Sequence, residues 1–170
     1  MERFQQELSE GKRQLMTADH LVSVTYLLVK DNKLLLTAAE NLFGAAKNLM
    51  ASLLHYDEAF KRDPHFKEEY DSMLYWFRQR CLPYYGLSRD YPVAADDLRI
   101  LLDEHKASSV EFSRKDGLVI CSDSYRIRKI TVTQLKSYVG ILKRMLFDVE
   151  GVVSRYEGIF GRSQGRAKAR

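Results

Sequence analysis

The stretch NKLLLTAAENLFGAAKNLMASLLHYDEAFKR, residues 32–62, decides the fold of this chain. Apolar side chains recur along it at alternating spacings of four and three, a helical periodicity that no strand maintains over such a length. The first apolar line consists of Leu35, Ala39, Leu42, Ala46, Leu49, Leu53, Tyr56 and Phe60. A second line widens the apolar arc beyond what a surface helix needs, and consists of Leu36, Phe43, Met50 and Leu54. The sequence therefore predicts a central helix with neighbours on most of its sides.

The remaining face of this helix carries small or uncharged polar side chains, where a solvent-facing helix would carry lysine and glutamate. This stripe consists of Thr37, Asn41, Gly44, Asn48, Ala51 and His55. Small side chains allow another helix to approach closely, so we expect an interface here, either with a further helix of this chain or with a second subunit. The interface candidates are Thr37, Asn41, Gly44, Asn48 and His55.

Further helices are expected around the central one, at residues 2–29, 64–82, 92–106 and about 132–156. The first includes the β-branched run LVSVTYLLV, which we assign to helix because helix-forming residues lead into it without a turn signal. Asp31 or Asn32 is expected to cap the central helix, and Asp63 with Pro64 to begin the next helix.

The hydrophobic period changes between the last two helices. Residues 110–113 alternate in polarity, Lys-Asp-Gly at 115–117 supplies a turn, and residues 118–121 are β-prone, which predicts a hairpin. Residues 125–128 also alternate, so a third short strand is an alternative, and Thr131 or Thr133 is expected to cap the last helix. The predicted fold is mainly α, an antiparallel bundle of about five helices with a small β-hairpin, at about residues 110–128, before the last long helix.

Length and composition indicate a single globular domain, since the chain has 170 residues, of which 45% are hydrophobic and 29% charged. We expect residues 1–157 to form the bundle and residues 158–170 to form a basic, disordered tail. The net charge of +4 resides in residues 151–170, which hold five basic residues and one acidic residue. The basic character is therefore a property of this tail and does not indicate a basic face on the fold.

Several patterns bear on the location of the protein. The longest near-apolar run, residues 21–29, is too short to span a bilayer, and the polar first residues lack the apolar core of a signal peptide. Cys81 and Cys121 have no metal-ligand spacing and are expected to be reduced thiols. We therefore expect a cytoplasmic protein without membrane contact.

The hairpin region concentrates basic side chains around a tyrosine, and could contact phosphates and stack a base. The nucleic-acid-binding candidates are Arg114, Lys115, Tyr125, Arg126, Arg128 and Lys129. The alternative is a solvated, charged edge of a short sheet, which protects such edges from aggregation. The basic tail has the same two explanations, nucleic-acid contact or solubility.

No metal site or cofactor is predicted. His55 with Glu58, and His65 with Glu68, are three residues apart, but a bundle metal site uses the reverse Glu-x-x-His order and several inward carboxylates. No activated nucleophile or glycine-rich phosphate loop is present in the sequence.

Arg99 and His105 are the remaining candidates for catalysis. The arginine could stabilise developing negative charge on a phosphate while the histidine acts as general base or acid. The alternative is a solvent-exposed arginine and a histidine favoured by the dipole at a helix C-terminus.

Long antiparallel helices carrying an Arg-x₅-His pair resemble the HEPN superfamily of helical bundles. This resemblance implies a metal-independent ribonuclease that uses Arg99 and His105. The chain departs from the HEPN pattern in having Ile100 where a polar residue usually follows the arginine, and in placing the pair before the hairpin instead of at the start of the final helix. Residues 108–131 are also similar to a stretch of uncharacterised archaeal helical proteins, a similarity that implies no function.

The sequence thus favours a non-enzymatic helical interaction module that self-associates as a homodimer or binds a protein partner. Contact with nucleic acid would occur through the basic hairpin and tail. The alternative function is the HEPN-like ribonuclease.

Overall fold

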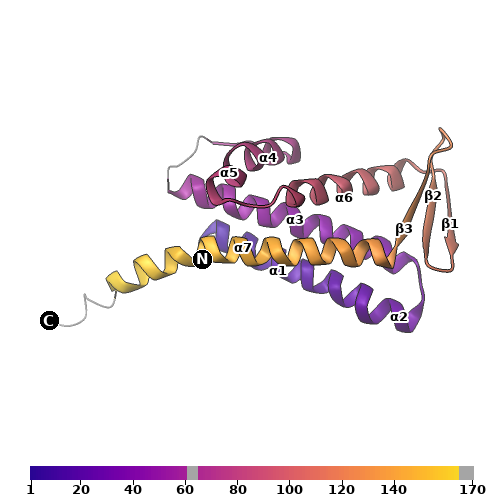
Figure 1. The fold of residues 1–170 in the computed structure, drawn as a ribbon, viewed down its shortest axis with the longest axis horizontal. Helices are drawn as coiled ribbons and strands as arrows, with labels where there is room; N and C mark the ends of the chain where they lie inside the picture. The colour runs from indigo at the N-terminus through magenta and orange to yellow at the C-terminus, as the bar shows by residue number, and fades with distance from the viewer. Residues whose placement is uncertain (61–64, 165–170) are drawn as a thin grey trace.

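The fold is known from a computed structural model that describes the backbone of residues 1–60 and 65–164, and the side chains of residues 1–60 and 65–155. It is mainly α, with long helices side by side and a small sheet across one end (Figure 1). The elements are α1 (Arg3–His20), η1 (Leu21–Thr25), α2 (Tyr26–Val29), α3 (Lys33–Ala59), α4 (Tyr70–Trp76), η2 (Phe77–Cys81), α5 (Leu82–Tyr85), α6 (Asp90–Ala107), β1 (Val110–Arg114), β2 (Gly117–Cys121), β3 (Ile127–Thr131) and α7 (Val132–Gln164). The predicted fold class is confirmed.

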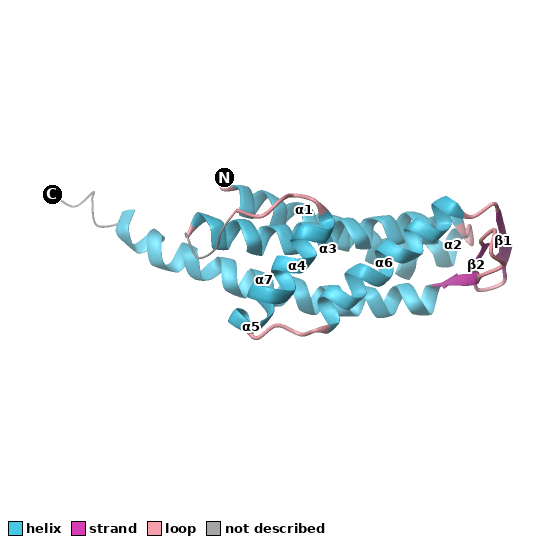
Figure 2. Ribbon diagram, turned by 90° about the horizontal axis from the view of Figure 1, so that it is seen from above, coloured by secondary structure: helices cyan, strands magenta, loops and turns pink. Residues whose placement is uncertain are grey.

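Helix α3 is central, as its two apolar lines predict. It packs against α1, α6 and α7 along its length (Figures 1 and 2). Side chains from both lines are buried in one core, Leu35, Leu42, Leu49 and Leu53 from the first and Met50 and Leu54 from the second. The helix begins one residue later and ends three residues earlier than the quoted stretch, at Lys33 and Ala59.

The first predicted helix is continuous from α1 through α2, with a π-helical turn, η1, in the β-branched run. It ends at Val29 and is followed by Lys30, which has a left-handed backbone conformation (φ 58°) and donates its N–H to the carbonyl of Tyr26. The assignment of this run to helix is therefore confirmed.

The second predicted helix starts later than expected, because α4 begins at Tyr70 and residues 65–69 are not helical. The ring of Phe66 lies 4.9 Å from that of His55, and Glu68 forms an ion pair with Arg3, so this segment is held against α3 and α1. The predicted cap at Asp63 and Pro64 lies outside the described residues. The helix also continues past Pro83, through η2 and α5, and ends at Gly86 (φ 64°).

The β element is a three-stranded antiparallel sheet in the order β1-β2-β3, so the alternative third strand is present. Directly paired residues of antiparallel strands share a face of the sheet. Leu118, Ile120 and Ile130 lie on the inner face and belong to the core of the bundle. The sheet therefore closes one end of the bundle and leaves its other face outward.

Helix α7 follows β3 directly. Thr131 Oγ1 accepts a hydrogen bond of 3.1 Å from the N–H of Gln134, so the first of the two predicted caps is observed. The helix continues to Gln164, beyond the predicted end near Tyr156. The backbone of this helix passes the predicted boundary at residue 157, and residues 165–170 of the expected tail lie outside the described part. None of the helices within the described residues is long and apolar enough to cross a membrane.

Candidate nucleic-acid interface

The sheet is fixed to the bundle by Asn32, which lies between α2 and α3 and is buried. Its Nδ2 donates hydrogen bonds to the carbonyl oxygens of Arg114 (3.1 Å) and Gly117 (2.9 Å), on either side of the β1–β2 turn. Its Oδ1 accepts a hydrogen bond of 2.8 Å from the hydroxyl of Tyr26. Of the two residues predicted to cap the central helix, Asp31 makes the side-chain contact, since its Oδ1 accepts a hydrogen bond from the N–H of Lys33 (2.9 Å). Asn32 therefore positions the turn that presents the basic residues.

The outer face of the sheet exposes apolar side chains on its flanking strands, around a buried centre at Val119. The strand register places Val110 and Phe112 of β1, Val119 of β2 and Ile127 of β3 on this face. Ile127 is 73% exposed, and Val110 and Phe112 are also exposed. An outward sheet face is ordinarily polar, and contiguous exposed apolar groups mark binding sites. The period-two pattern of β1 could have identified Phe112, because Val110, Phe112 and Arg114 are two residues apart and lie on one face of the strand.

Basic residues border the apolar centre at the turn end of the sheet. Arg114 and Lys129 lie on the outer face, and Lys115 lies in the β1–β2 turn. The Arg114 guanidinium carbon is 5.6 Å from the centroid of the Phe112 ring, a cation–π contact. Among the described residues, none of these three cations forms an ion pair, so their charge is available to a ligand.

The other end of the sheet carries Tyr125 and Arg126, in the loop between β2 and β3. Tyr125 is 88% exposed and has a left-handed backbone conformation (φ 58°), fixed by a hydrogen bond of 2.9 Å from its N–H to the carbonyl of Ser122. This loop lies about 15 Å from the β1–β2 turn, because each strand has five residues and rises about 3.3 Å per residue. The sequence-predicted residues therefore form two groups at opposite ends of the sheet, and Arg126 lines a cavity with Glu104 and Arg128 of the inner side.

Arg128 does not join either group. Its side chain lies on the inner face, where it pairs with Glu104 of α6. This ion pair holds the sheet against the bundle, so Arg128 has a structural contact of its own. The tail part of the nucleic-acid prediction falls on residues whose side chains lie outside the described part.

The uncharged stripe of α3 largely faces α1 of the same chain. Asn48 Nδ2 donates to Gln14 Oε1 (3.0 Å), and the Gln14 amide packs so closely on Gly44 that an added Cβ would lie 2.7 Å from Oε1. Thr37 and Asn41 bond to backbone carbonyls one turn earlier in α3. Of the two expected occupants, a helix of this chain therefore covers the middle of the stripe.

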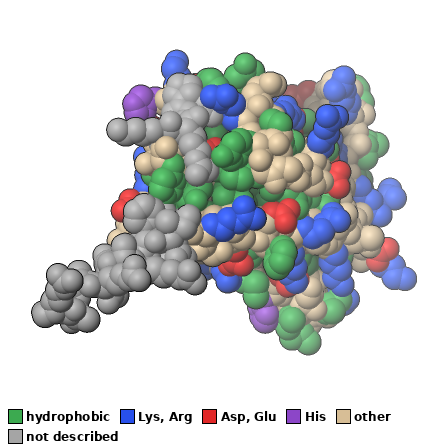
Figure 3. All heavy atoms as spheres, turned by 60° about the vertical axis from the view of Figure 1, so that its left-hand side comes forward, with side chains coloured by type: hydrophobic (Ala, Val, Ile, Leu, Met, Phe, Trp, Pro, Cys, Tyr) green, Lys and Arg blue, Asp and Glu red, His purple; other side chains and the backbone are tan. Residues whose placement is uncertain are grey.

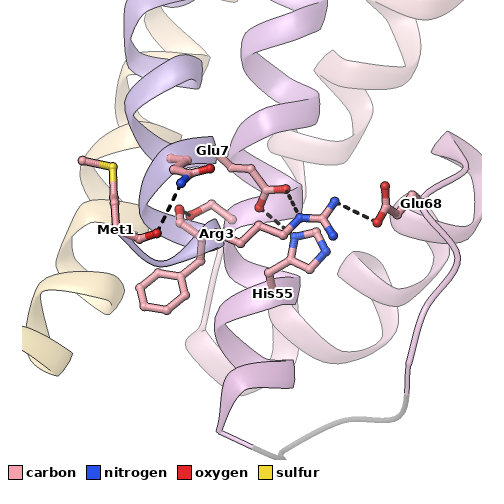
Figure 4. A network of polar contacts seen from close by, with 8 residues as sticks. Met1, Arg3, Glu7, His55 and Glu68 are labelled. Carbon is pink, nitrogen blue, oxygen red and sulfur yellow. Dashed lines mark hydrogen bonds and ion pairs between the residues drawn. The ribbon is translucent and has the colours of Figure 1, made fainter.

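His55, the last interface candidate, is buried in a charged network between α1 and α3 (Figure 4). Its Nδ1 lies 2.7 Å from Glu7 Oε2, and Arg3 contacts both Glu7 (3.3 Å) and Glu68 (2.7 Å). The network joins α1, α3 and the segment before α4. Within the part that the structure describes, no three His, Cys, Asp or Glu side chains gather as a metal site would require.

Arg99 and His105 contact different parts of the molecule. The guanidinium of Arg99 bonds to Asp96 Oδ1 (3.0 and 3.2 Å) and lies 5.3 Å from the ring centroid of Tyr70. His105 Nε2 lies 2.7 Å from Glu111 Oε2 on β1. The two side chains therefore engage α4 and the sheet separately, and neither directs the other toward a common reacting group.

On the side shown in Figure 3, basic, acidic and hydrophobic side chains are interspersed. Comparison with protein families, with characterised proteins and with solved structures finds no match to this chain. Function must therefore be inferred from the arrangement of its own residues.

Proposed function

We propose that this chain is a non-enzymatic interaction module that binds single-stranded nucleic acid across the outer face of its sheet. The observation that carries this proposal is the exposed Phe112 ring, bordered by Arg114 and Lys129 on the same face. Flat aromatic rings stack bases of any sequence, and neighbouring cations follow the phosphate backbone. Tyr125 and Arg126 repeat the combination of ring and cation in the loop at the other end of the sheet.

A single strand fits this face better than a duplex. Phe112 and Tyr125 can reach a base only when the base is unstacked, as in a single strand. The separation of about 15 Å between the two groups spans a few nucleotides of an extended strand, within the site sizes of small binding modules. The apolar side chains of Val110 and Ile127 between them would cover sugars and base edges.

The experiment is a titration of fluorescent single-stranded RNA and DNA oligonucleotides, followed by anisotropy at several salt concentrations. Four cations, Arg114, Lys115, Arg126 and Lys129, predict a slope of log K against log salt of about −3, at roughly −0.7 for each phosphate contact. Lys129→Gln should weaken binding and reduce the slope by about 0.7.

Phe112→Ala should weaken binding by about 1–3 kcal/mol and leave the salt slope unchanged, because it removes stacking and no charge. Lys67→Gln, an exposed lysine in the segment before α4, is the control for loss of charge elsewhere. The proposal fails if the wild-type chain does not bind at low salt, or if Lys67→Gln weakens binding as much as Lys129→Gln.

A further inference from the structure

A cavity of about 390 Å³ lies beside the turn end of the sheet, between the end of α2, the β1–β2 turn and the junction of β3 with α7. Its lining brings together three lysines from separate parts of the chain, Lys30, Lys115 and Lys129. Asp116 is the acidic residue in the lining, and Thr131 and Thr133 add hydroxyl groups. We infer that this cavity binds a phosphomonoester, the doubly charged phosphate at the end of a strand or on a nucleotide.

Charge complementarity supports a dianion as the occupant. The lining holds three lysines and one aspartate, a net charge of two positive, and a phosphomonoester carries about −1.5 to −2 at neutral pH. None of the three ammonium groups forms an ion pair with a described residue. Lysine donates as a point charge to phosphate oxygens, and the threonine hydroxyls can donate as well.

The position of Lys30 is a second, independent observation. Lys30 adopts the left-handed conformation after α2, where glycine or asparagine is ordinarily found. Its Nζ lies 5.6 Å from the ring centroid of Tyr26, which also lines the cavity. Left-handed conformations of residues other than glycine are uncommon and cluster at ligand-binding sites, which agrees with a role for Lys30 in this cavity.

The cavity is continuous with the outer face of the sheet. Lys129 and Thr131 are on that face, and their neighbours across β2 are Phe112 and Arg114. A strand lying on the sheet could therefore end with its phosphate among the three lysines. Leu27 and Val132 supply apolar walls, which suit a sugar or a base. The location on the strand rests on the proposed function, whereas binding of the phosphate itself does not.

The experiment compares strands of one sequence that carry a 5′-phosphate, a 3′-phosphate or hydroxyl groups at both ends. Adenosine 5′-monophosphate is titrated separately, by calorimetry on the full chain. We expect a strand with one terminal phosphate to bind about tenfold more tightly than the strand with hydroxyl ends, since bonds to charged groups are the strong ones. The end that gains affinity identifies the polarity of the bound strand.

Lys30→Gly is the decisive variant, because it removes one ammonium group and places glycine where the backbone favours it. It should fold with an unchanged or higher Tm and lose most of the preference for the phosphorylated strand. Lys115→Gln should do the same, whereas Lys33→Gln, three residues from Lys30 and outside the cavity lining, should keep the preference. Equal loss in Lys33→Gln would overturn the assignment to this cavity.

The outcomes separate the two proposals. If the three strands bind equally and adenosine 5′-monophosphate does not bind, the cavity inference is wrong and the strand-binding face stands. If adenosine 5′-monophosphate binds in a Lys30-dependent way and no strand does, the cavity inference stands and the proposed function is wrong. If no probe binds at low salt, both are wrong.

Discussion

Asn32 Nδ2 donates a hydrogen bond of 2.9 Å to the carbonyl oxygen of Gly117, and this contact joins the start of the central helix to a turn 85 residues later in the chain. Because Asn32 is buried and also receives the Tyr26 hydroxyl, its removal would leave several polar groups without partners. We expect Asn32→Ala to lower the free energy of unfolding by about 1–3 kcal/mol. Urea denaturation followed by circular dichroism measures this change.

Lys33→Ala, at the next residue, is the control, since its side chain is exposed. It should change the free energy of unfolding by no more than about 0.5 kcal/mol. Equal stability of Asn32→Ala and Lys33→Ala would show that the contact between the bundle and the turn is not needed for the fold.

The role of Asn32 shows where sequence patterns stop being informative. Periodicity predicted α3 well, because a long amphipathic helix is encoded locally. Local patterns predicted Asp31 or Asn32 as the helix cap and could not show the second role of Asn32, because the partners of its side chain belong to a distant turn. The uncharged stripe of α3 gives a second example. Its composition predicted a closely packed neighbour, but only the contacts of Gln14 and Glu7 with α3 identify that neighbour as α1.

The basic hairpin likewise combines features that the local sequence predicts with features that only the folded structure reveals. Its strands and turn were predicted from alternation, but Arg128 could not be separated from Arg114 until the strand register assigned them to opposite faces. The three lysines of the cavity are far apart in the sequence and meet only in the fold. The predicted helix boundaries were wrong in two places. The helix expected from residue 64 begins at Tyr70, after a segment held by tertiary contacts, and it continues past Pro83 through a π-helical turn.

Gly117 is required by the close approach of β3. A Cβ at this position would lie 2.3 Å from the carbonyl oxygen of Ile130, which is backbone and cannot move aside without separating the strands. We expect Gly117→Ala to lower the free energy of unfolding by more than about 1 kcal/mol. Chemical denaturation measures this change, and weaker protection of sheet amides from hydrogen exchange would locate it.

Gly140 is the matched control, because it lies exposed in α7 with no described atom within 4 Å of an added Cβ. Gly140→Ala should raise the free energy of unfolding by about 0.5–1 kcal/mol, since glycine is unfavourable within a helix. If both glycine variants change stability in the same direction, the close contact with Ile130 does not determine the effect.

The ion pair between Lys143 of α7 and Asp19 of α1 predicts a dependence of stability on acid pH. The hydrogen bond from Lys143, at 2.7 Å, lowers the pKa of Asp19 below its ordinary value of 3.8. A carboxyl whose pKa is lower in the folded state than in the unfolded state stabilises the fold at pH values above its unfolded-state pKa. This contribution is lost as the pH falls through the folded-state pKa.

Lys143→Ala should therefore lower the free energy of unfolding at pH 7 by less than about 1 kcal/mol, because the pair is partly exposed. The difference from wild type should shrink below pH 4. Lys136→Ala, an exposed lysine on the same helix, should follow the wild-type pH profile. Stability curves from urea denaturation at several pH values make the comparison, and a difference that stays constant down to pH 2 would contradict the linkage.

Arg99 and His105 provide a direct test of the HEPN-like alternative. Because Arg99 bonds to Asp96 and His105 bonds to Glu111, we expect no RNA cleavage that depends on both side chains. His105→Ala should only loosen the contact between α6 and β1, which Glu111→Ala loosens from the other side. End-labelled RNA, incubated without metal and resolved on a denaturing gel, provides the measurement. Cleavage that is abolished by His105→Ala and by Arg99→Ala, but retained by Glu111→Ala, would establish the ribonuclease instead.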